Sequence, residues 1–228
     1  MSLYDPAPAL ALVKRHEDVQ YPYLCEFGGA SLVVDEGVFC PLLTKTSPFL
    51  LRCIDFRPGE RVLDVFSGTG AFGIVAALQG AHTVTVDRSP KAVDCARRNA
   101  ERNDVARRVD VRLGDFSTTR PETYGVRLDE TFDLVIANPP LLPGAPRDAL
   151  SGALFDPELT ATATFLAVLP QHLAQDGRCY LLTSDVLERF GMSVERTCDE
   201  HGLRAEIVDV YDVGYEQYRV HRITRSRG

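Results

Sequence analysis

The sequence predicts an α/β fold with a doubly wound, mostly parallel sheet, preceded by a short N-terminal extension. From about residue 61 onward, β-rich apolar runs alternate with helical patterns, which is typical of repeated βαβ units. The length of 228 residues suits one such domain with a modest extension. A composition of 45% hydrophobic and 25% charged residues is that of an ordinary globular protein.

Two strand–helix units open the predicted domain. A strand over residues 61–66 is followed by a helix over 71–79, and a strand over 83–86 precedes a second helix. That second helix is expected to begin with Ser89 as its N-cap and Pro90 at its first helical position, which are residue types preferred there.

The rest of the sheet is predicted from further apolar runs and their boundaries. Pro170 is expected to kink or divide the helix that follows the fourth strand, and Gly202 to end the helix that follows the fifth. The expected elements are strands at 109–113, 132–137 and 178–183, a helix from Asp156-Pro157, a helix from Asp185 to Gly202, and a closing hairpin-like pair at 205–210 and 218–223.

Residues 1–57 are expected to form a hairpin and helix that pack at the substrate end of the sheet, ahead of a domain over 58–228. Glycine pairs favour the tight turns of two-residue hairpins. The expected elements of this extension are strands at 23–27 and 31–34, joined by a turn at Gly28-Gly29, and a helix around 47–54.

Composition and charge exclude several classes of protein. No apolar run approaches the roughly 18 residues that a membrane-spanning helix needs, and no basic segment of a signal peptide is expected at the N-terminus. The net charge of −7 gives no general attraction to nucleic acid. We expect no metal site and reduced thiols in the cytoplasm, because no Cys-x-x-Cys pair occurs among Cys25, Cys40, Cys53, Cys95, Cys179 and Cys198.

Cofactor-binding residues are expected where the parallel strands end, because an open α/β sheet binds its ligand there. The first strand ends in Asp64-Val65-Phe66-Ser67-Gly68-Thr69-Gly70, whose glycines permit a tight turn and a close backbone approach. Asp87, followed by Arg88, ends the second strand, where an acid can accept both hydroxyls of a ribose. Asp115 and Phe116 follow the third strand, placed to bind and stack on an adenine.

Gly68, Gly70 and Gly73 also match the G-x-G-x-x-G pattern of dinucleotide-binding proteins. A nicotinamide-dependent oxidoreductase and a non-catalytic nucleotide-binding module are therefore alternatives. Asp64 argues against a dinucleotide, because its carboxylate would repel a pyrophosphate nearby, whereas it suits the cationic amino end of a sulfonium cofactor.

The fourth predicted strand ends at Asn138-Pro139-Pro140-Leu141, which indicates chemistry at a nitrogen. The nitrogen of an amide or aromatic amine is a poor nucleophile because its lone pair is delocalised. If the Asn138 side-chain oxygen and the Pro139 carbonyl accept its hydrogens, the nitrogen is oriented and its lone pair turns toward the donated group. The prolines stiffen the loop and donate no competing N–H. A strand followed by an ordinary proline-rich loop is the alternative.

These segments resemble the successive motifs of class I S-adenosylmethionine-dependent methyltransferases, over about residues 23–225. The subgroup with an Asn-Pro-Pro-aromatic motif includes release-factor glutamine methyltransferases and rRNA and tRNA amino methyltransferases. The resemblance implies a Rossmann-like sheet of seven strands with the last antiparallel, S-adenosylmethionine as cofactor, and N-methylation as the reaction. The matching residues are Asp64, Phe66, Gly68, Gly70, Asp87, Gly114-Asp115, and Asn138 through Leu141.

Leu141 departs from that family, which usually has tyrosine or phenylalanine there to stack on a planar group. Leucine packs on a flat amide but gives up part of the stacking on a base, worth about 1–3 kcal/mol per base. A small-molecule or protein glutamine-like substrate is therefore favoured over RNA, and no membrane partner is expected. Methylation of an oxygen or carbon of a small molecule is the alternative. The sequence does not define the oligomeric state.

The predicted reaction is direct methyl transfer without a metal or a covalent enzyme intermediate. Residues 142–155, rich in proline, glycine and alanine, are the predicted substrate lid. The acceptor is assigned to Asn138, Pro139, Pro140 and Leu141, and the cofactor to Asp64, Phe66, Ser67, Gly68, Gly70, Asp87, Arg88, Asp115, Phe116 and Asn138.

Overall fold

The computed structural model describes residues 4–148 and 150–226. Residues 1–3, 149 and 227–228, which fall in the predicted extension, lid and domain, lie outside the described residues. The strands are β1 (Tyr23–Phe27), β2 (Ala30–Val34), β3 (Arg61–Val65), β4 (His82–Asp87), β5 (Val109–Leu113), β6 (Phe132–Ala137), β7 (Leu173–Ser184), β8 (Leu203–Asp212) and β9 (Gln217–Arg225). The α-helices are α1 (Ala7–Glu17), α2 (Thr46–Cys53), α3 (Ala71–Leu78), α4 (Pro90–Arg102), α5 (Thr160–His172), α6 (Val186–Arg189) and α7 (Val194–Glu200).

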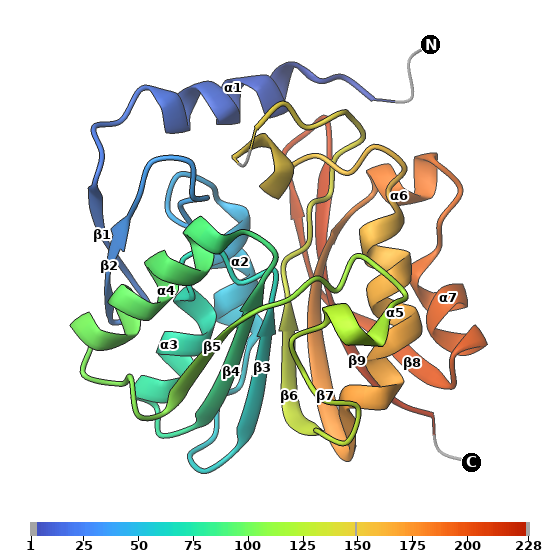
Figure 1. Ribbon diagram of the computed structural model, residues 1–228. Coiled ribbons are helices and arrows are strands. Elements are labelled where there is room, and N and C mark those ends of the chain that lie inside the picture. The colour runs from blue at the N-terminus through green and yellow to red at the C-terminus, as the bar shows by residue number, and fades with distance from the viewer. Residues whose placement is uncertain (1–3, 149, 227–228) are drawn as a thin grey trace.

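Seven strands form one sheet in the order β5-β4-β3-β6-β7-β9-β8, with helices on both faces (Figure 1). Strand β9 runs antiparallel to both of its neighbours, and all other pairs in this sheet are parallel. The predicted doubly wound sheet with an antiparallel last strand is confirmed. The predicted N-terminal hairpin is present as the separate pair β1–β2. No helix of the described residues is long and apolar enough to cross a membrane.

Two hydrophobic cores lie on opposite faces of the sheet. One joins the sheet to α2, α3, α4 and the N-terminal hairpin, and the other joins it to α5 and α7. Neighbouring strand residues alternate between them, since Val62 belongs to the first core and Leu63 to the second. The central strands are therefore buried on both faces, as parallel sheets require, and this burial fixes the strand ends that carry the site.

The N-terminal segment shares the first core with the sheet. The hairpin contributes Phe27 and Leu32 to it, and α2 contributes Phe49. Helix α1 is not predicted from the sequence, because Pro6 and Pro8 interrupt a mildly apolar run. In the structure both prolines stand at the helix start, where a missing backbone N–H has no helical partner to lose. The division of the chain at residue 57 stays a prediction.

Helix α2 is anchored at the far edge of the sheet. The Arg52 guanidinium donates to the Asp209 carboxylate at 2.8 Å. Asp209 stands at an irregularity of β8, where the register with β9 shifts after Ile207. Because α2 also contacts β7 and β9, its position depends on three strands at this side of the sheet.

The single helix predicted from Asp185 to Gly202 is wrong, because the segment forms the two short helices α6 and α7. Gly191, with φ of 88°, takes a left-handed conformation that ends the first helix. Ser193 then caps the second, accepting a hydrogen bond from the Arg196 N–H at 3.3 Å. The predicted helix start at Asp156 is also displaced, since α5 begins at Thr160.

Two residues that were predicted to shape helix α5, Asp156 and Pro170, lie near its two ends. The Asp156 carboxylate accepts a hydrogen bond from the Ala161 N–H at 2.6 Å, so it still satisfies a donor of the first turn. Pro170 lies in the last turn and the helix continues to His172, so the proline does not divide it.

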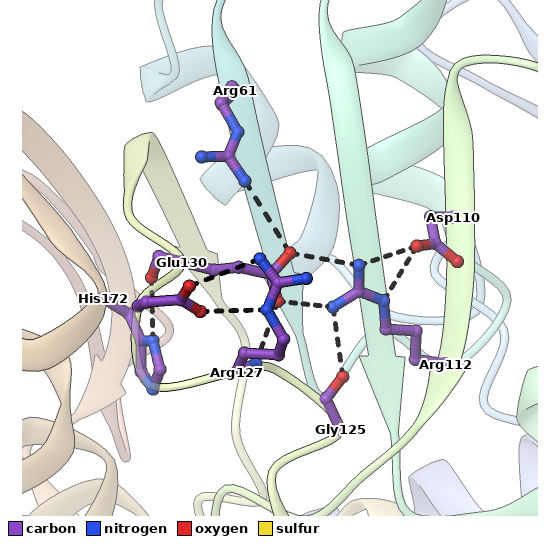
Figure 2. A network of polar contacts seen from close by, with 8 residues as sticks. Arg61, Asp110, Arg112, Gly125, Arg127, Glu130 and His172 are labelled. Atoms are coloured by element: carbon purple, nitrogen blue, oxygen red, sulfur yellow. Dashed lines mark hydrogen bonds and ion pairs between the residues drawn. The ribbon is translucent and has the colours of Figure 1, made fainter.

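A buried carboxylate ties the connection between β5 and β6 to the sheet. Glu130 accepts hydrogen bonds from Arg112 at 2.8 and 3.2 Å and from the Arg127 N–H at 2.9 Å (Figure 2). Arg61 approaches the same carboxylate at 3.8 Å. The Arg112 guanidinium is the main cause that lowers the pKa of Glu130 to about 2. This network holds the segment 114–131, which contains the predicted site residues Asp115 and Phe116.

Candidate active site

A cavity lies at the carboxyl ends of the central strands, between the loops that follow them and the N-terminal segment. It encloses about 1220 Å³ of space, part of it open to solvent. Among the predicted site residues, those that line it are Phe66, Ser67, Gly68, Asp87, Arg88, Asp115, Phe116, Asn138, Pro139, Pro140 and Leu141.

The loop after β3 has a backbone that few residue types accept. Phe66 has φ of 57° and Gly70 has φ of 74°, and the left-handed conformation is strained for phenylalanine. A Cβ on Gly70 would lie 2.9 Å from the Cβ of Ala96 in α4, so only glycine allows this close approach. Gly70 does not line the cavity. In the structure Gly70 has a packing role, and its predicted contact with a cofactor stays a prediction.

Asp64 lies beneath the same loop and is 1% exposed. Its carboxylate accepts a hydrogen bond from the Gly73 N–H at 2.9 Å, in the first turn of α3. Burial raises the pKa of Asp64 to about 7, and the Asp87 carboxylate adds to this effect. Asp64 was expected to meet the cofactor's amino end, but it is not part of the cavity wall. In the structure its carboxylate fixes the start of α3, and its predicted interaction with the cofactor's amino end stays a prediction.

Asp87 lines the cavity and also supports the loop. Its two oxygens accept hydrogen bonds from the Gly68 N–H at 2.8 Å and the Ser89 N–H at 2.9 Å. Burial raises the pKa of Asp87, and these two hydrogen bonds oppose the rise. Each carboxylate oxygen has a further lone pair for a ligand hydroxyl. Substitution of Asp87 therefore affects the loop and any ligand contact together.

Asp115 and Phe116 form the wall at the end of β5. The Asp115 carboxylate accepts hydrogen bonds from the Ser117 N–H at 2.8 Å and the Ser117 hydroxyl at 2.5 Å. The Phe116 ring is 2% exposed and stacks on Tyr124, with centroids 4.9 Å apart and an interplanar angle of 19°. The His172 ring packs against it in a T-shaped arrangement, with centroids 5.7 Å apart and an interplanar angle of 70°. The ring is therefore a rigid, flat surface.

Asn138 and Pro139 follow β6 directly and both line the cavity. The Asn138 side-chain nitrogen donates a hydrogen bond to the Ser47 hydroxyl oxygen at 3.4 Å. Ser47 stands in the first turn of α2 and is 1% exposed. With its nitrogen bonded to the protein, the carboxamide keeps its oxygen for a ligand.

The predicted lid, residues 142–155, supplies part of the cavity wall. The Leu142 N–H donates to the Leu154 carbonyl at 3.1 Å, which brings the two ends of the segment together. Arg88 donates to the Gly152 carbonyl at 2.8 Å and so connects the end of β4 with this segment. Movement of the segment as a lid stays a prediction.

Sequence reasoning placed the N-terminal segment at the substrate end of the sheet, but it named no residue of that segment or of β9 as part of the site. The only local signal is the run of hydroxyl residues at Thr44-Lys45-Thr46-Ser47, directly before a predicted helix. Positions that depend on the packing of α1 or on the pairing of β9 give no such signal. The missed lining residues include Leu12, Thr44, Thr46, Ser47 and Tyr218.

The cavity wall fits a cationic cofactor that carries a ribose and an adenine. Asp87 and Asp115 supply acceptors at adjacent strand ends, and Phe116 supplies the flat surface. The Ser67 hydroxyl lines the cavity and is buried without a hydrogen-bond partner among the described residues, so it suits a ligand contact. Arg88 is the only cationic side chain among the described lining residues.

The fold and the site together define a Rossmann-like, class I methyltransferase domain. The chain belongs to the methyltransferase domain family, whose model matches residues 56–226. The cofactor of this family of enzymes is S-adenosylmethionine, and the residues of the cavity wall are compatible with it.

Relatives of the chain act on several kinds of substrate. The release factor glutamine methyltransferase of Rhodopirellula baltica is 31% identical over 134 residues, which are 55% of this chain and 43% of that protein. The tRNA (guanine(10)-N2)-dimethyltransferase of Methanothermobacter thermautotrophicus is 33% identical over 98 residues, which are 41% of this chain and 27% of that protein. The chain thus spans less than half the length of these curated relatives.

A solved structure supports the fold assignment. The 16S rRNA N2 G1207 methyltransferase of T. thermophilus, in complex with AdoMet and guanosine, has a TM-score of 0.64 at 19% identity. The match covers 90% of this chain and 50% of that chain. At this level of identity the likeness shows a shared fold.

Proposed function

We propose that the protein transfers a methyl group from S-adenosylmethionine to an amide or amino nitrogen of an acceptor bound beside Asn138. The observation that carries the proposal is the position of Asn138 and Pro139. Both line the cavity at the end of β6, beside the glycine loop of β3. S-adenosylmethionine supplies a methyl group on positively charged sulfur, which leaves as a neutral thioether.

In this proposal, two oxygens of the chain orient the acceptor nitrogen. The Asn138 side-chain oxygen and the Pro139 carbonyl accept its N–H hydrogens and direct its lone pair toward the methyl group. The nitrogen gains positive charge as the new bond forms, and the two oxygens are held in advance to stabilise that charge. The methylated nitrogen then releases one proton to solvent, to which the cavity is partly open. Positioning of this kind can account for much of the rate enhancement.

The charges around the cavity favour an acceptor without phosphate groups. Arg88 is the only cation among the described lining residues, and its guanidinium already donates to the Gly152 carbonyl. Leu141, 7% exposed in the wall, offers a base less stacking than an aromatic ring would. A glutamine-like side chain of a protein or a small molecule is therefore proposed over RNA.

Cofactor selection is tested by calorimetry with S-adenosylhomocysteine and with NAD. We expect micromolar binding of the first and none of the second. Tight binding of NAD would overturn the assignment of the cofactor site.

The acceptor is tested with methyl-labelled S-adenosylmethionine and a cell extract that has been separated into protein, RNA and small-molecule fractions. We expect label in protein or small molecules that survives mild base, as N-methyl groups do and methyl esters do not. The Asn138→Ala variant should cut labelling by at least ~100-fold, the scale at which mispositioning is felt. Label in RNA would overturn the substrate class, and a base-labile product would identify an oxygen acceptor.

A further inference from the structure

The carboxamide of Asn138 has two ends with opposite hydrogen-bonding character. Its oxygen accepts and its NH₂ group donates, and rotation of the side chain by half a turn exchanges them. The proposed reaction needs the oxygen on the acceptor's side. A side chain that is free to rotate would offer a donor to the substrate N–H for part of the time.

One contact from the N-terminal segment holds this carboxamide. Ser47 accepts a hydrogen bond from the Asn138 side-chain nitrogen at 3.4 Å. Both residues line the cavity, although 91 positions separate them in the chain. Ser47 lies before residue 56, where the family match begins, so the contact comes from this chain's own N-terminal segment.

The hydroxyl of Ser47 is held firmly in place. The residue is 1% exposed and stands in the first turn of α2. Phe49 and Leu50 of the same helix are buried in the core, and Arg52 is paired with Asp209 of β8. A short helix whose buried side chains are packed in the core gives the hydroxyl little freedom to move away from Asn138.

We propose that Ser47 is a positioning residue, which engages the NH₂ group of Asn138 and so keeps the carboxamide oxygen directed at the acceptor nitrogen. This inference rests on the proposed function, because it gives Asn138 the role stated there. Ser47 itself touches neither the cofactor nor the reacting atoms in this scheme.

The test uses binding, so it needs no knowledge of the natural acceptor. Sinefungin is an analogue of S-adenosylmethionine in which an amine-bearing carbon replaces the methylated sulfur. It therefore presents N–H donors at the place of the transferred methyl, whereas S-adenosylhomocysteine presents none. The ratio of their two dissociation constants, measured by calorimetry, reports how well the site accepts an N–H at that point.

We expect Asn138→Ala to lower the preference for sinefungin by about tenfold, because acceptance of a hydrogen bond from a charged donor is lost. Ser47→Ala should lower it by about threefold or more, since the oxygen is then misdirected for part of the time. Ser47→Thr, which keeps the hydroxyl, should retain the wild-type ratio. Ser193→Ala, which removes a hydroxyl at the start of α7, serves as the matched control and should also retain it.

The outcomes separate the two proposals. If Asn138→Ala leaves the ratio unchanged, the acceptor role of Asn138 fails and the inference about Ser47 fails with it. If Asn138→Ala lowers the ratio but Ser47→Ala does not, only the positioning role is overturned. Should Ser47→Ala also weaken S-adenosylhomocysteine binding through misfolding, Ser47→Cys decides, because sulfur keeps the volume and is a weak acceptor. An unchanged ratio in Ser47→Cys then overturns the inference.

Discussion

The imidazole of His16 accepts a hydrogen bond from the backbone N–H of Cys40 at 3.1 Å, through its Nε2. Its Nδ1 lies 2.9 Å from the Leu12 carbonyl, to which it donates when the ring is neutral. The ring also stacks on Phe39, with centroids 5.1 Å apart. Because Leu12 and Phe39 both line the cavity, a buried neutral histidine joins two parts of its wall.

Acidic pH should weaken the connection that His16 makes between the two parts of the cavity wall. Burial lowers the pKa of His16 below 6.5, so its contribution to stability is full above that pH and is lost as the pH falls toward the folded-state pKa. Burial also lowers the pKa values of His172 and His221, so all three contribute to the loss. We expect His16→Gln to reduce, without abolishing, the fall in unfolding free energy below pH 6.5, measured by urea titration. The exposed His201→Gln is the control, and an equal effect of both variants would contradict the prediction.

Asp87→Asn should lower the affinity for S-adenosylhomocysteine by at least about tenfold, because hydrogen bonds to a charged acceptor contribute about 1.5–3 kcal/mol. The asparagine NH₂ group would also face a backbone donor, at Gly68 or Ser89, in place of a carboxylate oxygen. Calorimetry measures the affinity. Asp94→Asn removes an exposed acid of α4 that pairs only with Arg97 among the described residues, and it should bind normally. Equal affinities would place the ribose contact elsewhere.

Asp64→Asn should make stability and cofactor binding less dependent on pH. A carboxyl whose pKa is raised from 3.8 to about 7 contributes stability that is present below 3.8 and is lost as the pH rises toward 7. The asparagine oxygen can still accept the Gly73 N–H but does not ionise. The variant should therefore be at least as stable as the wild type at pH 8, and the two should agree near pH 4.

The wild type should bind S-adenosylmethionine more tightly as the pH rises through 7, because an ionised Asp64 attracts its positive charge, and the variant should lack this trend. Asp133→Asn is the matched control, since that carboxylate also accepts a backbone N–H, from Arg61, outside the cavity lining. A trend that persists in Asp64→Asn would assign the titration to another group.

Glu130→Gln should lower the free energy of unfolding at pH 7 by about 3 kcal/mol, as removal of one partner of a buried ion pair does. The pKa of Glu130 is lowered from 4.5 to about 2 by Arg112, so the stability is present above pH 4.5 and lost as the pH falls toward 2. Denaturant titration measures it. Glu206→Gln, at an exposed pair with Arg222, should change the free energy by under about 1 kcal/mol. A similar effect of both variants would show that the network of Figure 2 contributes little.

The regular part of the fold was predictable because local rules and packing agree there. In β3, Val62 and Leu63 point to opposite cores, so a continuous apolar run is required and is visible in the sequence. Ser89 and Pro90 start α4 as their residue types predict. The break at Gly191 was missed because an isolated glycine inside a helical pattern is often tolerated.

The site residues at the ends of the parallel strands were predictable. Those on segments that are distant in the sequence and pack over the strand ends were not. Asp87 ends β4 and Asn138 follows β6, the two parallel strands on either side of β3, so their position at the same edge of the sheet follows from topology alone. The exclusion of Asp64 from the wall depends on a loop that turns over it, which its sequence position does not reveal. Ser47 and Tyr218 reach the cavity through packing between segments far apart in the chain.

The pairing of Arg52 with Asp209 has a mechanical consequence. Helix α2 has only eight residues, and it carries Ser47 at one end and Arg52 near the other. A helix of this length moves as a rigid body. A displacement of Arg52 at the outermost strand would therefore also displace the Ser47 hydroxyl in the cavity. If Ser47 positions Asn138 as proposed, variation along the solvent-facing rim of β8 would therefore alter how an acceptor is held, without any change in the residues that touch it.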